Sequence, residues 1–598
     1  MCGIIGYVGK NDFIKVAKQG LLNLEYRGYD SAGLSFFEKD KITTIKNVGD
    51  VKSLFSIVPH GTLTSVGIGH TRWATHGVPT VQNCHPHYSE DKKFYVVHNG
   101  IIENYQQIKD TYLKKTNFYS ETDTEVIPNL LSHFYSKNHN VVDSIKQTID
   151  ILKGSFALVI MHSDEPSKLY FAKRNSPLII GIGKGENYIS SDLLGFGDSV
   201  KKYIITNDNS YGFITTKKVK LFVNNLCIKP EIKKLTKSKF NMSLGDYPFY
   251  MLKEISEVPL AIQETCAIYE KKLNPLTNIN LDYFKGIDEI LFVACGTSYH
   301  SGLVGTKYCK LLANIKSRSV IASEFIYEKE ILNQRTLCVF ISQSGETADT
   351  LSAIKKAKQN GAKTIGITNV PNSTICQLCD YILPIKAGRE VAVASTKAYN
   401  AQLTMLLILA GYLGNHYNIN KTLMEQLKKA SNIVDPTKII NNITKIAKKL
   451  SKSKNIYLVG RDLDYITCME ASLKLKEISY IPCEAYPAGE LKHGTLALIT
   501  KNTPVIAVIT QKSLIDKTMM IINQVKARGG KVYVFTNQDL SKYGTKGLTI
   551  VNTDAVSCEL VSPIITIVVF QLLAYQTTLC LGYNPDRPRN LAKSVTVE

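Results

Sequence analysis

The second residue of this chain combines two reactive groups. Cys2 follows the initiator Met1, and its small side chain allows Met1 to be removed after synthesis. The new first residue would then carry a thiol and a free α-amino group, whose pKa of about 7.7–8.0 suits it to accept the thiol proton. Gly3 and Gly6 leave room for close backbone approach. We therefore expect Cys2 to be a nucleophile, although a cysteine at this position alone would carry little weight.

Five polar motifs follow Cys2 within the first 240 residues. They are Glu25–Ser31, His70–Gly77, His85–His87, His98–Gly100 and Glu121–Val126. Together with Cys2, and in this order, they resemble the glutamine amidotransferases that use an N-terminal nucleophile. The resemblance implies that this part of the chain hydrolyses the side-chain amide of glutamine and releases ammonia.

The resemblance also implies roles for individual residues. Amide cleavage places negative charge on the carbonyl oxygen, which the Asn99 side chain and the Gly100 backbone N–H would stabilise. Arg72 would bind the carboxylate of glutamine, and Asp123 its ammonium group. The other glutamine-site residues implied are Thr75 and His76 in the same pocket, Arg27 ordering the loop over Cys2, His85 near the contact between domains, and Trp73, the only tryptophan, gating the passage of ammonia.

Each of these residues also has a simpler interpretation. Arg72 and Asp123 could form a surface salt bridge, and Asn99-Gly100 is a common turn sequence. His85 could be an ordinary polar residue of a loop. The occurrence of all the motifs in one order favours the glutaminase interpretation.

A second set of motifs follows predicted strands in the C-terminal part. Ser342–Thr347 (SQSGET) precedes a predicted helix from about Ala348, and its hydroxyls and N–H groups could bind a phosphate or simply cap that helix. Cys295–Ser298 (CGTS) ends the preceding strand, where ligands of open α/β sheets bind. With Ala392–Tyr399, these motifs resemble sugar isomerase domains, which bind phosphorylated sugars. The sugar-phosphate residues implied are Cys295, Gly296, Thr297, Ser298, Ser342, Gln343, Ser344, Thr347, Val393, Ser395 and Ala592.

The C-terminal part contains two related halves. Gly361–Thr368 matches Gly529–Thr536 at an offset of 168 residues. The loop that could bind a phosphate, Ser342–Gly345, corresponds to Thr510–Ser513 (TQKS) in the second half. The second loop lacks the glycine. We therefore expect a duplicated α/β subdomain in which only the first copy binds the phosphate.

Three further motifs extend the resemblance over almost the whole chain. They are Leu473–Tyr480, Gly489–Thr495 and Asp586–Glu598. Together with the N-terminal motifs they resemble the glucosamine-6-phosphate synthase family. The resemblance implies glutamine and fructose 6-phosphate as substrates, glucosamine 6-phosphate and glutamate as products, a homodimer, and neither a metal ion nor an organic cofactor.

This family resemblance implies four catalytic residues in the C-terminal part. Glu477 would move a proton between adjacent sugar carbons, and Lys593 would form a Schiff base with the keto sugar. His493, supplied by a neighbouring subunit, would act as the acid–base group of ring opening. Lys474 would share a helix face with Glu477. Alternatively, Lys474 and Glu477 form an exposed ion pair, and Lys593 is a mobile charge of the tail.

Two other functions remain open at this point. Another amidotransferase, of a phosphoribosyl or asparagine-forming type, would need a pyrophosphate or ATP site, and the sequence contains no GxxxxGK[ST] loop. A sugar-phosphate-binding regulator would have no use for Cys2, Glu477 and Lys593 together.

Two kinds of fold are needed to position these motifs. Short alternating strands such as Phe94–Val97, with few helices, predict an α+β domain with antiparallel sheets that ends near the basic stretch Lys229–Lys239. After it, β-branched runs alternate with helical patterns, which predicts two α/β sugar isomerase subdomains with parallel sheets. The expected parts are a glutaminase domain over 2–240, a linker over 241–280, subdomains over 281–430 and 445–588, and a tail over 589–598 that covers the sugar site.

The composition of the chain limits the class of protein and the partners that are expected. A chain of 598 residues is too long for one hydrophobic core, and 44% hydrophobic with 21% charged residues is typical of globular proteins. We attribute the net charge of +21 to lysines spread over a solvated surface, and expect neither nucleic acid nor a membrane as partner. The 13 cysteines predict no zinc site, and the apolar window Ile564–Cys580 predicts a buried helix. A cytoplasmic protein is expected.

Overall fold

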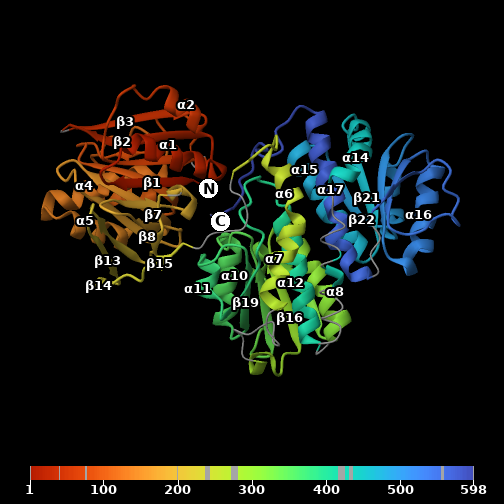
Figure 1. Cartoon of the computed structure of the whole chain (residues 1–598). Coiled ribbons are helices and arrows are strands. Elements are labelled where there is room, and N and C mark those ends of the chain that lie inside the picture. Colours follow the sequence, from red (N-terminus) through yellow and green to blue (C-terminus); the bar gives the residue numbers. More distant parts are fainter. Residues whose placement is uncertain are drawn as a thin grey trace. The chain divides into compact units, whose positions relative to one another are not determined.

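The computed structural model describes residues 2–39, 41–73, 77–197, 199–235, 243–270, 281–414, 425–427, 429, 436–553 and 558–596. The chain divides into two compact units, Met1–Lys237 with Ala592–Glu598, and Ser238–Leu591. Figure 1 colours the first unit mainly red to yellow and the second mainly green to blue.

The first unit contains two antiparallel sheets. The order of the eight-stranded sheet is β15-β11-β9-β10-β1-β4-β2-β3, and that of the seven-stranded sheet is β14-β13-β12-β8-β7-β6-β5. The strands are β1 Gly3–Val8, β2 Ser31–Glu38, β3 Lys41–Val48, β4 Val66–Arg72, β5 His87–Tyr88, β6 Phe94–Ile102, β7 Gly154–His162, β8 Leu169–Arg174, β9 Ile179–Ile182, β10 Asn187–Ser190, β11 Lys202–Ile205, β12 Ser210–Ile214, β13 Val219–Val223, β14 Leu226–Ile228 and β15 Lys233–Lys234.

Alternating side chains place these sheets between two layers of helices. On β1, Ile4 and Val8 belong to the core between the two sheets, whereas Ile5 and Tyr7 pack with helices α1 (Phe13–Leu24) and α2 (Val51–Ser56). On β6, Phe94 and Val96 pack with α4 (Val126–Asn138) and α5 (Val141–Ile151). The order of layers is therefore helix, sheet, sheet, helix, which confirms the predicted α+β domain.

Strand β1 lies in the interior of the eight-stranded sheet. It pairs with β4 on one side, where Gly3 is opposite Thr71, and with β10 on the other, where Ile5 is opposite Ser190. Every residue of β1 is buried. The beginning of the chain is thus fixed by hydrogen bonds on both sides, and Cys2 stands directly before the strand.

The second unit contains two parallel five-stranded sheets of the same topology. Their orders are β17-β16-β18-β19-β20 and β22-β21-β23-β24-β25. The strands are β16 Glu289–Ala294, β17 Lys316–Ile321, β18 Thr336–Ile341, β19 Lys363–Thr368, β20 Tyr381–Pro384, β21 Ile456–Gly460, β22 Cys483–Pro487, β23 Pro504–Ile509, β24 Lys531–Thr536 and β25 Thr549–Asn552. The predicted duplication of a parallel α/β subdomain is confirmed.

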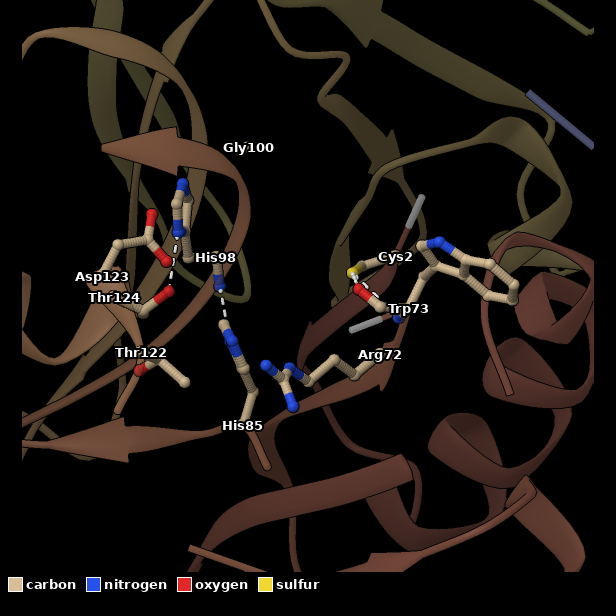
Figure 2. A pocket seen from close by; sticks show the side chains of 9 residues that line it. All are labelled: Cys2, Arg72, Trp73, His85, His98, Gly100, Thr122, Asp123 and Thr124. Atoms are coloured by element: carbon tan, nitrogen blue, oxygen red, sulfur yellow. Dashed lines mark hydrogen bonds between the residues drawn. The ribbon is translucent and has the colours of Figure 1, made fainter. Parts of the chain in front are cut away.

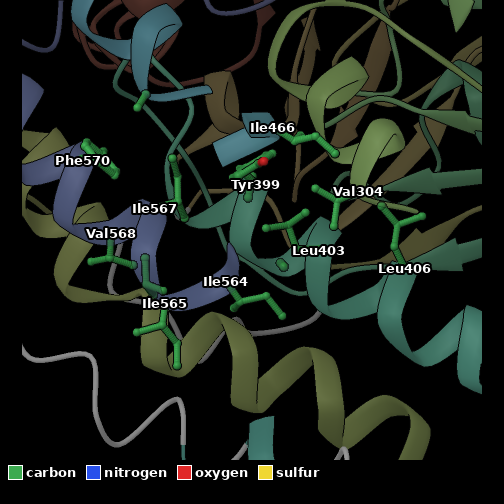
Figure 3. Packing of buried hydrophobic residues seen from close by; sticks show 14 of the residues in the cluster. Val304, Tyr399, Leu403, Leu406, Ile466, Ile564, Ile565, Ile567, Val568 and Phe570 are labelled. Carbon is green, nitrogen blue, oxygen red and sulfur yellow. The ribbon is translucent and has the colours of Figure 1, made fainter. Parts of the chain in front are cut away.

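Four helices join the two subdomains through one apolar core. They are α8 (Gly296–Tyr308), α12 (Lys397–Leu413), α15 (Leu463–Ser479) and α17 (Ser562–Cys580). Figure 3 shows Val304, Leu406, Ile466 and Ile567 from these helices packed together. The segment Glu559–Cys580 is long and apolar enough to cross a membrane, but 89% of its most apolar window is buried within the protein. It is a core helix, as the sequence predicts.

Some predicted elements differ from the observed ones. The sequence pattern predicts a strand over Leu63–Ile68, but the observed strand, β4, is Val66–Arg72, so both of its ends are displaced by several residues. Helix α5 was not predicted, although Val141, Ile145 and Ile149 form its buried face at a spacing of four residues. Part of the predicted basic linker, Lys233–Lys234, forms β15 and pairs with β11.

The core around α12 yields a stability prediction. Leu406 is fully buried, so Leu406→Ala should lower the free energy of unfolding of the second unit by about 2–5 kcal/mol. Leu311, in the π-helical segment Cys309–Ala313, is 62% exposed, and Leu311→Ala should change it by less than about 0.5 kcal/mol. Calorimetric unfolding of the full-length protein measures both, and equal losses for the two variants would contradict the assignment of this core.

Candidate active sites

A pocket in the first unit opens beside Cys2. It is lined by Cys2, Arg72, Trp73, His85, His98, Gly100, Thr122, Asp123 and Thr124 (Figure 2). The Trp73 backbone N–H donates to the Cys2 Sγ at 3.2 Å, and the Asn99 Nδ2 donates to the Cys2 carbonyl oxygen at 2.9 Å. Both ends of the Cys2 residue are therefore held in place, and its thiol faces the pocket.

Two glycines permit the close packing around Cys2. A Cβ on Gly28 would lie 2.7 Å from the backbone of Arg72 and of Trp73. A Cβ on Gly3 would lie 2.6 Å from the Thr71 Oγ1, which accepts a hydrogen bond from the Gly3 N–H at 3.1 Å. The close approach expected at Gly3 is present, and the glycine of the EYRGYDS motif has the same steric function.

Asn99 and Gly100 lie on β6 beside the nucleophile. The His70 Nε2 lies 3.1 Å from the Asn99 Oδ1 and 3.0 Å from the His98 carbonyl oxygen. Because both neighbours are acceptors, Nε2 carries the proton, and this bond turns the Asn99 NH2 group toward Cys2. Gly100 has φ +130°, and a Cβ there would lie 2.0 Å from the Ser155 carbonyl oxygen, so no other residue fits.

Buried histidines surround these groups. The rings of His70 and His85 stack with centroids 4.1 Å apart, and the His98 backbone N–H donates to the His85 Nδ1 at 3.2 Å. Burial lowers the pKa of His70 to about 3 and holds the pKa values of His85 and His87 well below their usual range. These three imidazoles are neutral at pH 7 and act as fixed hydrogen-bonding and stacking groups.

Arg72 and Asp123 place opposite charges in the same pocket. Both side chains are almost fully buried, so the surface salt bridge considered for them is wrong. Arg72 ends β4 and donates through Nη2 to the Gly77 carbonyl oxygen at 3.2 Å. Asp123, in the short helix η2 (Asp123–Glu125), accepts from the Ile102 N–H at 2.7 Å. A cation and an anion beside a thiol can bind the two charged groups of a free amino acid.

The remaining residues predicted for the glutamine site lie as follows. Arg27 is buried and donates to the Asp192 Oδ2 at 2.9 Å. The Trp73 ring meets that of Tyr29 edge-on, with centroids 5.5 Å apart. His85 lines the Cys2 pocket itself, and its expected place near another domain stays a prediction. Thr75 and His76 lie outside the described residues.

The SQSGET loop connects β18 to helix α10 (Ala348–Gln359) in the second unit. The Ser342 Oγ accepts from the Gly345 N–H at 3.0 Å and lies 2.9 Å from the Thr347 Oγ1. The Thr347 side chain makes no capping bond to α10. Its hydroxyl therefore belongs to the loop rather than to the helix end, which favours the phosphate interpretation over the helix-cap alternative.

The CGTS motif begins α8 and meets α15 of the second subdomain. The Lys474 Nζ donates to the Glu477 Oε2 at 2.6 Å and to the Thr297 Oγ1 at 3.0 Å. The Lys474 side chain is fully buried, and that of Glu477 is 21% exposed. The alternative of an exposed ion pair is therefore wrong. This arrangement joins a residue of the first subdomain to two predicted catalytic residues of the second.

Other residues predicted for the sugar site are more dispersed. The Ser298 Oγ accepts from the Gln402 Nε2 at 3.0 Å, and the Ser395 Oγ donates to the Glu390 Oε2 at 2.8 Å. The Val393 N–H donates to the Asp586 carbonyl oxygen at 3.1 Å. Cys295, Gln343 and Ser344 are partly exposed, and Gly296 and His493 are exposed. Ala592 and Lys593 group with the first unit, so their place at the sugar site stays a prediction.

Several residues of these sites were not predicted. Thr122 and Thr124 line the Cys2 pocket, and their hydroxyls lie 3.1 Å from the His87 Nε2 and 2.8 Å from the His98 Nδ1. Both flank Asp123 in the ETDTEV motif, and this position beside a predicted site residue is the sequence signal that indicates them. Glu470 lies four residues before Lys474 on the same helix face, 3.4 Å from its Nζ.

Two of the cysteines have a spacing that is common in metal sites, although no zinc site is predicted from the sequence. Cys376 and Cys379 have the C-x-x-C spacing that is common in zinc sites. Cys376 belongs to the short helix α11 (Thr374–Leu378), and Cys379 directly follows it. Within the described residues, no group of three or more His, Cys, Asp or Glu side chains could hold a metal ion.

Comparison with known proteins matches a domain family to each of the two units. Residues 70–196 match the glutamine amidotransferase domain, and residues 284–411 and 449–581 each match the SIS domain. The C-terminal domain of glucosamine-fructose-6-phosphate aminotransferase from Francisella tularensis covers 58% of this chain at 36% identity, with a TM-score of 0.54, and is itself covered completely.

Relatives that match the whole length of the chain are also aminotransferases of this kind. A glutamine–fructose-6-phosphate aminotransferase (isomerizing) from Caldanaerobacter subterraneus subsp. tengcongensis is 42% identical, and one from Clostridium tetani 41% identical, each with all of both chains covered. The match therefore includes the glutaminase fold, the doubled isomerase fold and the sequence that joins them. The chain belongs to the family of glutamine–fructose-6-phosphate aminotransferases (isomerizing).

Proposed function

We propose that this chain converts fructose 6-phosphate and glutamine into glucosamine 6-phosphate and glutamate. The observation that carries the proposal is that one chain combines two features: a pocket that holds a thiol between opposite charges, and a doubled sugar isomerase fold. Such aminotransferases match the chain over its full length. The product would supply reactions that build amino sugars.

The glutamine half of the reaction uses the pocket around Cys2. After removal of Met1, the α-amino group of Cys2 takes the proton of its own thiol, and Sγ attacks the amide carbon of glutamine. Arg72 binds the substrate carboxylate and Asp123 its ammonium group. The amide nitrogen of Asn99 has two hydrogens, of which the structure commits one to the Cys2 carbonyl oxygen. The second hydrogen and the Gly100 N–H stabilise the oxyanion. Ammonia leaves with the proton held by the α-amino group, and water then cleaves the thioester on Cys2 to release glutamate.

The sugar half uses the first isomerase loop and helix α15. Hydroxyl and N–H groups of Ser342–Thr347 bind the phosphate at the carboxyl end of β18. Lys593 would first condense with the C2 carbonyl of the ketose and release water, and ammonia would then displace the Lys593 amine to leave an imine at C2. Glu477 then moves a proton from C1 to C2, which gives the aldose amine. Trp73 would gate the passage of ammonia.

Assembly and location are part of the proposal. His493 is exposed at the end of η6 (Glu490–His493), so it is accessible to a second copy of the chain. This supports a homodimer in which each subunit supplies His493 to the other. We place the enzyme in the cytoplasm, and we propose no metal ion or organic cofactor.

Amino-sugar formation tests the proposed function directly. The purified protein, mixed with glutamine and fructose 6-phosphate, should form one glucosamine 6-phosphate for each glutamate released, as quantified by mass spectrometry. Hydrolysis of glutamine without formation of an amino sugar would contradict the synthase assignment. Formation of glutamate by a Cys2→Ala variant would contradict the assignment of the nucleophile.

Asn99 provides a second test. Asn99→Ala removes one oxyanion donor and should lower kcat for glutamate release about 10²–10³-fold. Asn117→Ala is the matched control, because Asn117 is exposed in the same unit and bonds only to Glu90 among the contacts described for it. It should leave kcat within about twofold. A kcat for Asn99→Ala within threefold of the wild type would exclude Asn99 from the oxyanion site.

A further inference from the structure

Two titratable side chains lie next to the Lys474–Glu477 pair and have no role in the proposed reaction. Glu470 lies one turn before Lys474 on α15, and its side chain is 1% exposed. His300 lies on α8 of the first subdomain, and its Nδ1 is 2.7 Å from the Glu470 Oε2. The pair thus bridges the two isomerase subdomains at the point where Glu477 works.

One helix fixes both oxygens of the Glu470 carboxylate. The Thr297 Oγ1 donates to Oε1 at 3.0 Å, and the His300 Nδ1 contacts Oε2. Thr297 and His300 are three residues apart on α8, so they lie on the same helix face. Thr297 in turn accepts from Lys474 at 3.0 Å. The Glu470 carboxylate is therefore held rigidly, with its charge directed at the Lys474 ammonium group.

The Lys474 ammonium group has two carboxylate partners of different character. Glu477 is partly exposed and close, at 2.6 Å, whereas Glu470 is buried and more distant, at 3.4 Å. Burial acts to lower the pKa of Lys474, but the two carboxylates outweigh burial and hold it above its ordinary value. Lys474 therefore stays charged, and a buried charge without a counter-ion is strongly unfavourable.

The chemistry of Glu477 makes the second partner necessary. When a general base takes a proton from C1 of the sugar imine, its carboxylate becomes a neutral acid. Lys474 then loses the negative charge of its nearest partner while remaining buried. Glu470 takes no part in this proton transfer and keeps its charge, so the ammonium group stays paired throughout.

We propose that Glu470 is a positioning residue that keeps Lys474 paired while Glu477 cycles between its charged and neutral forms, and that His300 holds Glu470 in place by a hydrogen bond from Nδ1. The proposal rests on the proposed function, because it assigns Glu477 as the base. Neither residue needs to touch the sugar.

Variants of the full-length protein separate this role from a merely structural one. Glu470→Gln keeps the shape of the side chain but removes its charge, and should lower kcat for glucosamine 6-phosphate formation at least tenfold. KM for fructose 6-phosphate should stay within threefold, and glutamine hydrolysis at Cys2 should be unchanged. Glu484→Gln is the matched control, because Glu484 is an exposed carboxylate on β22 of the same subdomain, and kcat should stay within twofold.

Two substitutions test the hydrogen bond from His300. His300→Asn places an N–H donor where Nδ1 stands and should keep kcat within threefold of the wild type. His300→Leu removes the donor and should lower kcat at least fivefold, again with little change in KM. Thermal melting of each variant is measured in parallel.

The outcomes that overturn the proposal are distinct. A Glu470→Gln variant with wild-type kcat, or equal losses in His300→Asn and His300→Leu, would overturn it. Parallel losses in kcat, KM and melting temperature would also overturn it, because they indicate a structural role alone. A wild-type protein that forms no amino sugar would refute the proposed function together with this inference. An active wild type with an unimpaired Glu470→Gln would refute this inference alone.

Discussion

The candidate glutaminase site depends on a topological constraint: the strand that directly follows Cys2 lies inside a sheet. A nucleophile that uses its own α-amino group must stand at the end of the chain, where backbone is usually frayed. Here the strand after Cys2 pairs on both sides, with β4 and β10, and all six of its residues are buried. Cys2, directly before this strand, is thereby held in a fixed position. Arg72 and Trp73, at and directly after the end of the neighbouring strand, are brought to Cys2 by the same pairing.

Neutral groups orient the reactive ones in this pocket. Burial keeps His70, His85 and His87 uncharged. His70 contacts Asn99, and His87 and His98 contact the threonines beside Asp123. Under the proposed function, Arg72 and Asp123 would bring opposite charges to the substrate. In the second unit the arrangement is the opposite, because a buried ammonium and two carboxylates converge on one face of α15. Each unit thus suits its chemistry: recognition of a charged amino acid in one, and repeated proton transfer in the other.

Much of the fold and of the Cys2 pocket could be predicted from the sequence, because short local motifs and residue patterns indicate them. Strand β6 and helix α10 begin at the predicted residues, Phe94 and Ala348, because a run of aromatic and β-branched residues marks the strand and a polar loop precedes the helix. The duplication was visible from matching strands in one order. Cys2, Asn99, Arg72 and Asp123 were found because each stands in a motif, and the structure brings them to a single pocket or, for Asn99, to the backbone of Cys2.

Other features could not be predicted, because they arise from contacts between distant segments. Nothing near Glu470 indicates that Thr297 and His300, about 170 residues away in sequence, hold its carboxylate. The histidine stack likewise joins His70 of β4, in one sheet, to His85, which precedes β5 of the other sheet. Helix α5 is a different case, since its apolar face repeats every four residues and an N-cap Asn140 precedes it. There the periodicity was present and was overlooked among the neighbouring strands.

The central claim is that nitrogen released at Cys2 becomes the amine of the sugar. The most direct measurement supplies glutamine labelled with ¹⁵N in its side-chain amide, together with fructose 6-phosphate and an excess of unlabelled ammonium. The account predicts glucosamine 6-phosphate that carries ¹⁵N, because the ammonia passes between the two sites of the enzyme. A product that carries the unlabelled nitrogen of the solution would contradict it.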